Sequence, residues 1–378
     1  KHQPSILFES GILVLVFVVH LLSVNQSNTK RYMKLTRITG IVAGLSLLVA
    51  GMQAQVSLPA VFTDHMVLQQ KSEVPVWGWG SASATIKVVG SWAPLDTATT
   101  VVRSDGTWDT TLKTIGAGGP YTLSVLGDGT RELKDVMLGE VWLCSGQSNM
   151  EWTPMHGIDN SEEEVAAANY PNIRFFHIPK RGAATPQNNC EASWAPCTPD
   201  RMKSTSAIAY FFGRDLQKDL NVPVGLIVSA WGGTPAEVWV PEEQVMNNPR
   251  IRDVMPDKTY PWWPVEPGVL YNQMISPVVP YALAGAIWYQ GESNRDHPDS
   301  YGILLKTMVE SWRKSFKKDF PFYLVQIAPF TYNAGDNGAA LVREHQEWVA
   351  RTVPGAGMVA VSDCVADVKN IHPTDKQS

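Results

Sequence analysis

The sequence has few cysteines and no cluster of metal-binding side chains. Four of its 378 residues are cysteines, and they form no C-x-x-C pair and no His/Cys cluster. Structural zinc sites are built from closely spaced Cys and His ligands. The sequence therefore offers no basis for a metal site or for another cofactor, and we expect neither.

A strong charge of either sign is also missing. The 31 Lys and Arg and the 36 Asp and Glu leave a net charge of −5, and no run of basic residues occurs. Because nucleic-acid binders usually present a clustered basic face, we expect no nucleic-acid partner. With 44% hydrophobic and 18% charged residues, the chain is too apolar for wholesale disorder and can form a packed core.

No apolar run is long enough for a comfortable membrane span, which needs roughly 18 or more residues. The first run, Ile12–Val24, is interrupted by His20, and the second covers Ile38–Ala50. Two membrane helices are the alternative interpretation of these runs, and the shortness of both argues against it.

The second apolar run has the surroundings of a secretory signal peptide. The basic segment Met33–Arg37 precedes it, and the small residue Ala54 follows it. A basic start, a short apolar core and a small residue at the cleavage site are typical of such peptides. We predict that residues 33–54 are a signal peptide cleaved after Ala54, and that residues 1–32 are upstream sequence translated by mistake. The mature protein is then periplasmic or secreted and free of the membrane.

Export bears on how the cysteines are interpreted. Cys190 and Cys197 are close in sequence and can close a small disulfide in an oxidising compartment. Cys144 lies in an apolar run, and we expect it to be a buried free thiol.

From residue 55 to about 134, the pattern is that of short strands joined by turns. Trp108, Thr110 and Leu112 alternate with Asp, Thr and Lys, and Asp105-Gly106 and Asp128-Gly129 are turn signals. No helical periodicity occurs in this region. We predict a small antiparallel β-domain over residues 55–134, arranged as a sandwich.

From residue 135 to 378, apolar strands alternate with helical patterns. Such alternation predicts an α/β domain with a mostly parallel sheet, helices on both faces and a functional site beyond the carboxyl ends of the strands. The predicted helices are Ser206–Leu220, Tyr301–Phe316 and Gly338–Arg351, and the predicted strands are Glu140–Cys144, Ile173–His177, Val224–Ala230, Ala284–Tyr289, Phe322–Ala328 and Gly357–Ser362.

The first of these strands is followed by a serine in a tight turn. Ser148 lies in the segment Cys144-Ser145-Gly146-Gln147-Ser148-Asn149-Met150, where its hydroxyl can be presented at the end of the sheet. The segment is not the G-x-S-x-G elbow of α/β-hydrolases, because Met150 replaces the last glycine. By itself, such a serine is more often a turn or cap residue than a nucleophile.

Two further turns carry groups that suit an oxyanion. Gly232 and Gly233 follow a strand, and their small size lets backbone N–H groups approach a ligand. Gln290, Glu292 and Asn294 crowd another turn, where an amide can donate to an oxyanion and the carboxylate can orient a partner. The alternative is an ordinary strand-to-helix turn in each case, with a polar residue capping the helix.

The loop after the last strand contains acids and a histidine. A serine hydrolase needs a histidine within reach of the serine and an acid that holds the tautomer of the imidazole. Asp363, Asp367 and His372 follow Ser148 in the order Ser…Asp…His that some hydrolases use. Among the other histidines, His177 at the end of a strand is the main alternative base.

Several segments of the chain match one known family. These are Leu58-Pro59, Asp64–Gln69, Trp77–Trp79, Gly139–Met150, Trp288–Asn294 and Ile371–Pro373. From about Leu58 to its last residue, the chain resembles the sialate O-acetylesterases, which are SGNH (GDSL-like) hydrolases. The resemblance implies metal-free hydrolysis of O-acetyl esters on sugars, commonly sialic acids and in some relatives acetylated xylan. It also implies a β-domain followed by a flavodoxin-like catalytic domain.

The resemblance also implies roles for individual residues. Ser148 matches the nucleophile, His372 matches the base, and Gly233 or Gly232 matches the second element of the oxyanion hole. The turn Gln290–Asn294 occupies the place of the block that donates a side-chain hydrogen bond, although it lacks the G-x-N-D form. Within that turn, Gln290 and Asn294 are the candidate donors.

The acid is where the sequence departs from the family pattern. Many SGNH enzymes have Asp three residues before the histidine, and here that position is Lys369. Asp367 or Asp363 must then serve, or serine and histidine act as a dyad supported by a carbonyl; we favour Asp367. Glu292 and Arg295 are the candidate substrate-binding residues. Since a closing helix would normally follow the histidine, we expect that the chain is truncated at its C-terminus.

The sequence therefore predicts an exported esterase that removes O-acetyl groups from sugars, most of all from sialic acids, through an acetyl-enzyme on Ser148. Acetylated xylan is the alternative substrate. A non-catalytic carbohydrate-binding protein is the alternative of another class, and contact between serine and histidine would argue against it. The sequence does not determine the oligomeric state.

Overall fold

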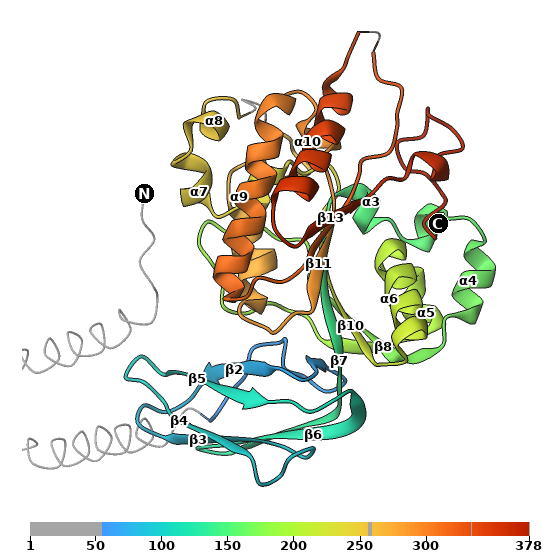
Figure 1. The fold of residues 1–378 in the computed structure, drawn as a ribbon. Coiled ribbons are helices and arrows are strands. Elements are labelled where there is room, and N and C mark those ends of the chain that lie inside the picture. The colour runs from blue at the N-terminus through green and yellow to red at the C-terminus, as the bar shows by residue number, and fades with distance from the viewer. Residues whose placement is uncertain (1–54, 256–258, 334, 378) are drawn as a thin grey trace, which may run out of the picture. The chain divides into compact units, whose positions relative to one another are not determined.

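The computed structural model of the chain describes residues 55–255, 259–333 and 335–377 (Figure 1). They fall within one compact unit that spans Ala54–Ser378. The signal peptide and the upstream segment, residues 1–54, lie outside the described residues, so both stay predictions. Within the described residues, no helix is long and apolar enough to cross a membrane.

The N-terminal region consists largely of antiparallel strands, as the alternating pattern predicts. β2 pairs with β5, β3 pairs with β4 and β6, and β6 pairs with the start of β7. The described residues 55–134 contain no helix, and a separate sandwich domain stays a prediction. The strands are β1 Val67–Gln69, β2 Glu73–Trp79, β3 Thr85–Gly90, β4 Thr97–Val101, β5 Thr107–Lys113, β6 Gly118–Leu126 and β7 Thr130–Gly146.

The second region contains a mostly parallel sheet, which confirms the predicted α/β class. Its strand order is β13-β12-β11-β7-β10-β8-β9, and β9 runs antiparallel to β8. If β8 and β9 are left out and the other five strands are numbered along the chain, their order across the sheet is 2-1-3-4-5. This is the flavodoxin-like order. The added strands are β8 Tyr170–His177, β9 Trp194–Cys197, β10 Val224–Ala230, β11 Gly285–Tyr289, β12 Phe322–Val325 and β13 Ala356–Val359, of which the sequence analysis missed β9.

β7 joins the two predicted regions as one strand. Its first part pairs antiparallel with β6, and its second part lies parallel to β10 and β11. Asp135, near the change of partner, has a left-handed backbone with φ 53°. Its carboxylate accepts a hydrogen bond from the Arg174 guanidinium on β8 at 2.6 Å. The predicted domain boundary at residue 134 lies inside this strand, and the division into two domains stays a prediction.

Helices cover both faces of the parallel sheet. α6 Ala207–Leu220 lies on one face, and α9 Pro298–Phe316 and α10 Gly338–Thr352 lie on the other (Figure 1). All residues of β10 and β11 are consequently buried. The three predicted helices are confirmed. α9 begins at Pro298, earlier than the predicted Tyr301, and proline is well tolerated in a first helical turn. The shorter helices are α3 Ser148–Glu151, α4 Ser161–Ala167, α5 Pro199–Lys203, α7 Glu242–Met246 and α8 Pro249–Arg252.

Cys190 and Cys197 are free thiols, which corrects the disulfide hypothesis. Cys197, at the end of β9, is buried in the hydrophobic cluster that contains the start of α6. Cys190 packs against the other hydrophobic cluster, so the two thiols belong to different parts of the core. Cys144 is fully buried and free, as predicted, and burial raises the pKa of its thiol.

Candidate active site

Three of the predicted motifs lie at the carboxyl edge of the parallel sheet. They follow β7, β10 and β11, of which β7 is the middle strand. Gly146 ends β7 with φ 145°, and a Cβ at this position would lie 2.1 Å from the Tyr289 carbonyl oxygen. Only glycine tolerates both the conformation and the close approach. Ser148 then begins α3.

Ser148 is in contact with His372. The Ser148 Oγ lies 2.9 Å from the His372 Nε2. The Trp152 indole stacks on the imidazole, with ring centroids 4.1 Å apart and an interplanar angle of 22°. In the described part of the chain, His177, the alternative base, makes no hydrogen bond with Ser148. A hydroxyl and an imidazole nitrogen at this distance form the pair that nucleophilic catalysis needs.

The environment keeps the His372 imidazole neutral. Burial lowers the pKa of His372 to about 4, and the charges of Lys376 and His156 act in the same direction. A neutral imidazole has a lone pair that can accept the Ser148 proton. Burial also lowers the pKa of the Lys376 ammonium group, to about 8.

The predicted acid, Asp367, does not contact His372, which corrects the triad prediction. Asp367 is exposed, and its Oδ1 accepts a hydrogen bond from the Lys369 N–H at 2.9 Å. This local turn directs the carboxylate back to its own segment. Asp363 is exposed as well, in a short 3-10 segment. Among the described residues, no carboxylate is hydrogen-bonded to the His372 imidazole.

Asn149 connects the serine segment to the histidine segment. Its Nδ2 donates to the Ile371 carbonyl oxygen at 3.0 Å and to the Glu292 Oε1 at 2.8 Å. Its Oδ1 accepts a hydrogen bond from the Lys376 Nζ at 2.7 Å. These bonds use both donors and the oxygen of the amide. Because Asn149 follows the serine and Ile371 precedes the histidine, the amide holds the two segments together.

The candidate substrate-binding residues, Glu292 and Arg295, are both engaged within the protein. Glu292 is 6% exposed, and burial raises the pKa of its carboxyl group. The Arg295 guanidinium pairs with Asp336 and lies 4.4 Å from the centre of the Tyr332 ring. Neither side chain is presented freely to a substrate, so these interactions argue against the predicted roles.

Gln290 and Asn294 are buried inside the turn that follows β11. The Gln290 Nε2 donates to the Asn294 Oδ1 at 2.7 Å and to the Thr234 carbonyl oxygen at 3.2 Å. The Asn294 Nδ2 donates to the Glu237 Oε2 at 2.9 Å. The amides therefore stabilise the packing of two loops, which corrects the prediction that one of them donates to the oxyanion.

The two glycines after β10 differ in their surroundings. A Cβ on Gly232 would lie 3.2 Å from the Ser148 Cβ, so this loop lies against the serine. The Gly232 N–H donates to the Glu151 Oε2 at 2.6 Å. Gly233 has φ 81°, and its N–H makes no hydrogen bond within the described residues. Of the two candidate glycines, Gly233 is therefore the one whose backbone N–H is available to an oxyanion. Its role in an oxyanion hole stays a prediction.

The sequence analysis missed three side chains that support the site. Trp152 contacts the imidazole, Lys376 lies beside it, and Asn149 joins the two segments. A signal was present in the sequence, because Trp152 and Lys376 each follow a predicted catalytic residue by four positions. Asn149 lies within the serine motif, but nothing in that motif indicates which groups its amide would bind.

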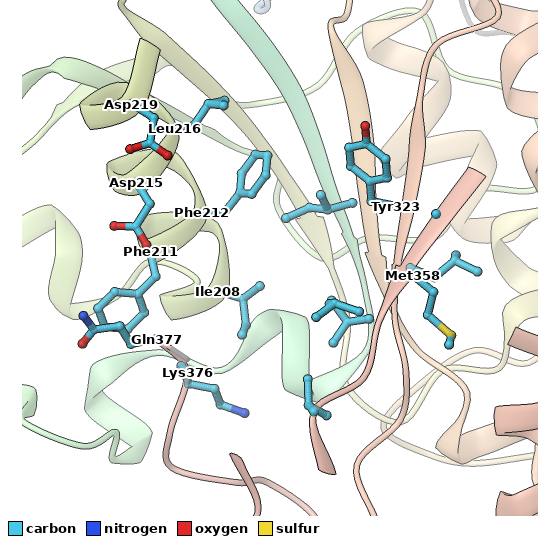
Figure 2. Close-up of a pocket in the computed structure, with 16 residues that line it drawn as sticks. Ile208, Phe211, Phe212, Asp215, Leu216, Asp219, Tyr323, Met358, Lys376 and Gln377 are labelled. Carbon is cyan, nitrogen blue, oxygen red and sulfur yellow. The ribbon is translucent and has the colours of Figure 1, made fainter. Parts of the chain in front are cut away.

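A groove that does not include the serine lies over the face of the sheet beside α6. Figure 2 shows Phe212 and Leu216 of α6 on one side of it and Tyr323 and Met358 on the other. The cavity has a volume of about 640 Å³, and Lys376 lies at its end. Since its lining contains neither Ser148 nor His372, we do not assign the ester chemistry to this groove. Within the described residues, no group of three or more His, Cys, Asp or Glu side chains is placed to hold a metal ion.

Known proteins resemble the chain in sequence and in structure. The model of the family described as "Carbohydrate esterase, sialic acid-specific acetylesterase" matches residues 138–378. The sialate O-acetylesterases of Pongo abelii and Homo sapiens are each 32% identical over 354 residues, which cover 83% of this chain and 67% of each relative. The crystal structure of a carbohydrate acetylesterase from Xanthomonas citri matches with a TM-score of 0.76 and 33% identity, covering 85% of this chain and 72% of that one.

The family match covers the part of the chain that holds the contact between Ser148 and His372. The full-length relatives agree with it over most of the chain, and the solved structure agrees in fold. The chain therefore belongs to the sialic acid-specific acetylesterase family of carbohydrate esterases, a family of carboxylic ester hydrolases.

Proposed function

We propose that this chain removes O-acetyl groups from sugars, with acetylated sialic acids as the first substrate class and acetylated xylan as the second. The observation that carries the proposal is the 2.9 Å distance between the Ser148 Oγ and the His372 Nε2. A protein that only binds carbohydrate has no use for such a pair, so the contact argues against the non-catalytic alternative.

The first half of the proposed reaction acylates the serine. The Ser148 Oγ attacks the carbonyl carbon of the acetyl group while the His372 Nε2 accepts the hydroxyl proton. The resulting oxyanion lies near the backbone N–H groups of Ser148 and Gly233. When the tetrahedral intermediate collapses, the bond to the sugar oxygen breaks, and His372 returns the proton to that oxygen.

The second half releases acetate. A water molecule attacks the acetyl group on Ser148, and the His372 Nε2 accepts a proton from the water. Collapse of this second intermediate breaks the bond to the Ser148 Oγ, which takes the proton back from His372. Trp152 and Asn149, rather than a carboxylate, hold the imidazole in place through the cycle in this proposal.

The test is acetate release from acetylated sugars by Ser148→Ala and by a matched control. Ser148→Ala should abolish turnover because no nucleophile remains. Ser145→Ala is the control, since the Ser145 hydroxyl is buried and has no hydrogen-bond partner among the described residues, so its removal should leave most activity. Near-normal turnover by folded Ser148→Ala would overturn the serine mechanism.

The choice of substrate can be tested in the same assay. Initial rates on O-acetylated sialic acid and on acetylated xylan should both depend on Ser148, and the ratio of their kcat/KM values ranks the two classes. Release of acetate from neither, by a folded protein, would contradict the proposed substrate class.

We also propose that the protein is exported to the periplasm or beyond, on the strength of the predicted signal peptide at residues 33–54. Protein recovered from a bacterial envelope should begin at or near Gln55. An intact leader on protein recovered from the cytoplasm would overturn this proposal.

A further inference from the structure

A second cavity, lined by aromatic side chains, lies between Trp231, which directly follows β10, and residues 259–266, which come after α8. It has a volume of about 310 Å³, and we call it the aromatic cavity. The aromatic residues that line it are Trp231, Tyr260, Trp262 and Trp263. The Trp263 ring centroid is 4.8 Å from that of Tyr260 and 5.6 Å from that of Trp262, so the rings form one cluster.

This cavity adjoins the candidate active site. The Trp231 N–H donates to the Gly146 carbonyl oxygen at 3.1 Å, two residues before Ser148. The Trp263 ring covers Gly233, where a Cβ would lie 2.6 Å from a ring carbon. Gly232, next to Trp231 and Gly233 in sequence, lies against Ser148. A ligand whose acetyl group reaches the serine can therefore extend onto these rings.

The lining of the cavity favours an uncharged ligand with flat apolar faces. Trp262 is 62% exposed, and leaving a large apolar ring in water is unfavourable unless a partner covers it. Glu266 is the one charged residue among the described residues that line the cavity. A carboxylate would meet its negative charge without a compensating cation. A pyranose offers C–H faces for the rings and hydroxyl groups for the Glu266 carboxylate.

We propose that the aromatic cavity binds a neutral pyranose unit that is linked to the acetylated sugar, so that the enzyme acts on acetylated oligosaccharides rather than on isolated sugars. This inference rests on the proposed function, because it assumes that the acetyl group is placed at Ser148. It adds a binding site that accepts the same neighbour whether the acetylated unit is a sialic acid or a xylose.

The test compares one exposed tryptophan in the cavity with one outside it. Trp262→Ala should raise KM for acetylated xylotetraose and for acetylated sialyllactose by about tenfold, the loss expected for one stacking contact. It should leave hydrolysis of 4-nitrophenyl acetate unchanged, because this small ester does not reach the cavity. Trp348→Ala is the matched control, since Trp348 is 40% exposed on α10 and does not line the cavity.

Direct binding separates this inference from the proposed function. Ser148→Ala should bind unacetylated xylotetraose and lactose with a change in tryptophan fluorescence, and Trp262→Ala in the same background should lose that binding. Unchanged binding or unchanged KM in the Trp262 variants would overturn the inference. Loss of 4-nitrophenyl acetate hydrolysis in Ser148→Ala tests the proposed function alone.

Discussion

The imidazole of His372 lies beside the Trp152 indole and the Lys376 ammonium group, and among the described residues no carboxylate is hydrogen-bonded to it. Trp152 stacks on one face of the imidazole. The pKa of His372 is lowered by burial first, and then by Lys376 and His156. In a triad, an acid fixes the tautomer and stabilises the imidazolium that forms during the reaction. Here the stacking ring can fix the orientation, while burial and the Lys376 ammonium group disfavour the imidazolium.

The position of Asp367 leads to the first prediction. Asp367→Asn should change kcat by less than about twofold, the usual range for an exposed substitution, because its carboxylate, among the described residues, bonds within its own turn. Loss of a true triad acid would cost on the order of 10⁴ in turnover. Steady-state kinetics of Asp367→Asn and Asp363→Asn distinguish a small change in kcat from the loss of a triad acid. A large loss of turnover in either variant would restore that residue as the acid.

The pH dependence of kcat/KM is the second prediction. Only neutral His372 accepts the Ser148 proton, so activity falls as the pH falls through the pKa of His372. Since burial lowers this pKa to about 4, kcat/KM at pH 5 should be close to its value at pH 7. An unshifted histidine, with a pKa near 6.5, would already have lost most activity at pH 5.

A variant at Lys376 checks the cause of that shift. Lys376→Met keeps most of the side-chain volume and removes one charge that lowers the pKa of His372. The acidic limb of the profile should then move to higher pH. A wild-type limb centred near pH 6.5, or no movement in Lys376→Met, would contradict this account.

At the scale of elements, the site depends on a link between α3 and the C-terminal loop. The Asn149 amide makes two hydrogen bonds to this loop, at the Ile371 carbonyl oxygen and the Lys376 Nζ, and a third to Glu292 after β11. Glu292 and Lys376 are both buried. Without the amide, a buried ammonium group and a buried carboxylate would each lose a partner. Such losses are costly, because buried polar groups cannot turn to water instead.

The third prediction follows from this link. Asn149→Ala should lower the free energy of unfolding by about 3 kcal/mol, since two buried charged groups lose a hydrogen bond. It should also lower kcat, because the serine and histidine segments are no longer tied. Urea unfolding measures the first effect. Asn169→Ala, at an exposed asparagine, is the control and should change stability by less than about 0.5 kcal/mol. A similar small change in Asn149→Ala would refute the role of the link.

At the scale of the whole molecule, the fold does not rely on disulfides. Cys190 and Cys197 pack against different hydrophobic clusters, and Cys144 is fully buried. Our fourth prediction is that a thiol reagent labels both Cys190 and Cys197 in unfolded, unreduced protein, as it does after reduction. Protein isolated from an oxidising compartment gives the strictest test, and labelling of Cys190 and Cys197 that appears only after reduction would show that a bridge forms.

The order of elements along the chain was predictable because it depends on local patterns. β10 was predicted with its observed bounds, since an apolar stretch buried on both faces needs no partner to be recognised. Ser148 and His372 were identified from residue type, from their position after strands and from the resemblance to a known family. Their contact confirms that these two segments meet, across 224 positions of sequence.

The hydrogen-bond partners at the site were decided by the tertiary structure alone. Gln290 and Asn294 have the chemistry of oxyanion donors, yet their amides are used between loops. Asp367 has the chemistry of an orienting acid, yet its turn directs it elsewhere. A short segment determines which groups it carries, whereas the direction in which each group points depends on loops that meet only after the sheet has formed. For the same reason, the sequence predicted the serine and its base but not the ring and the amide that hold them.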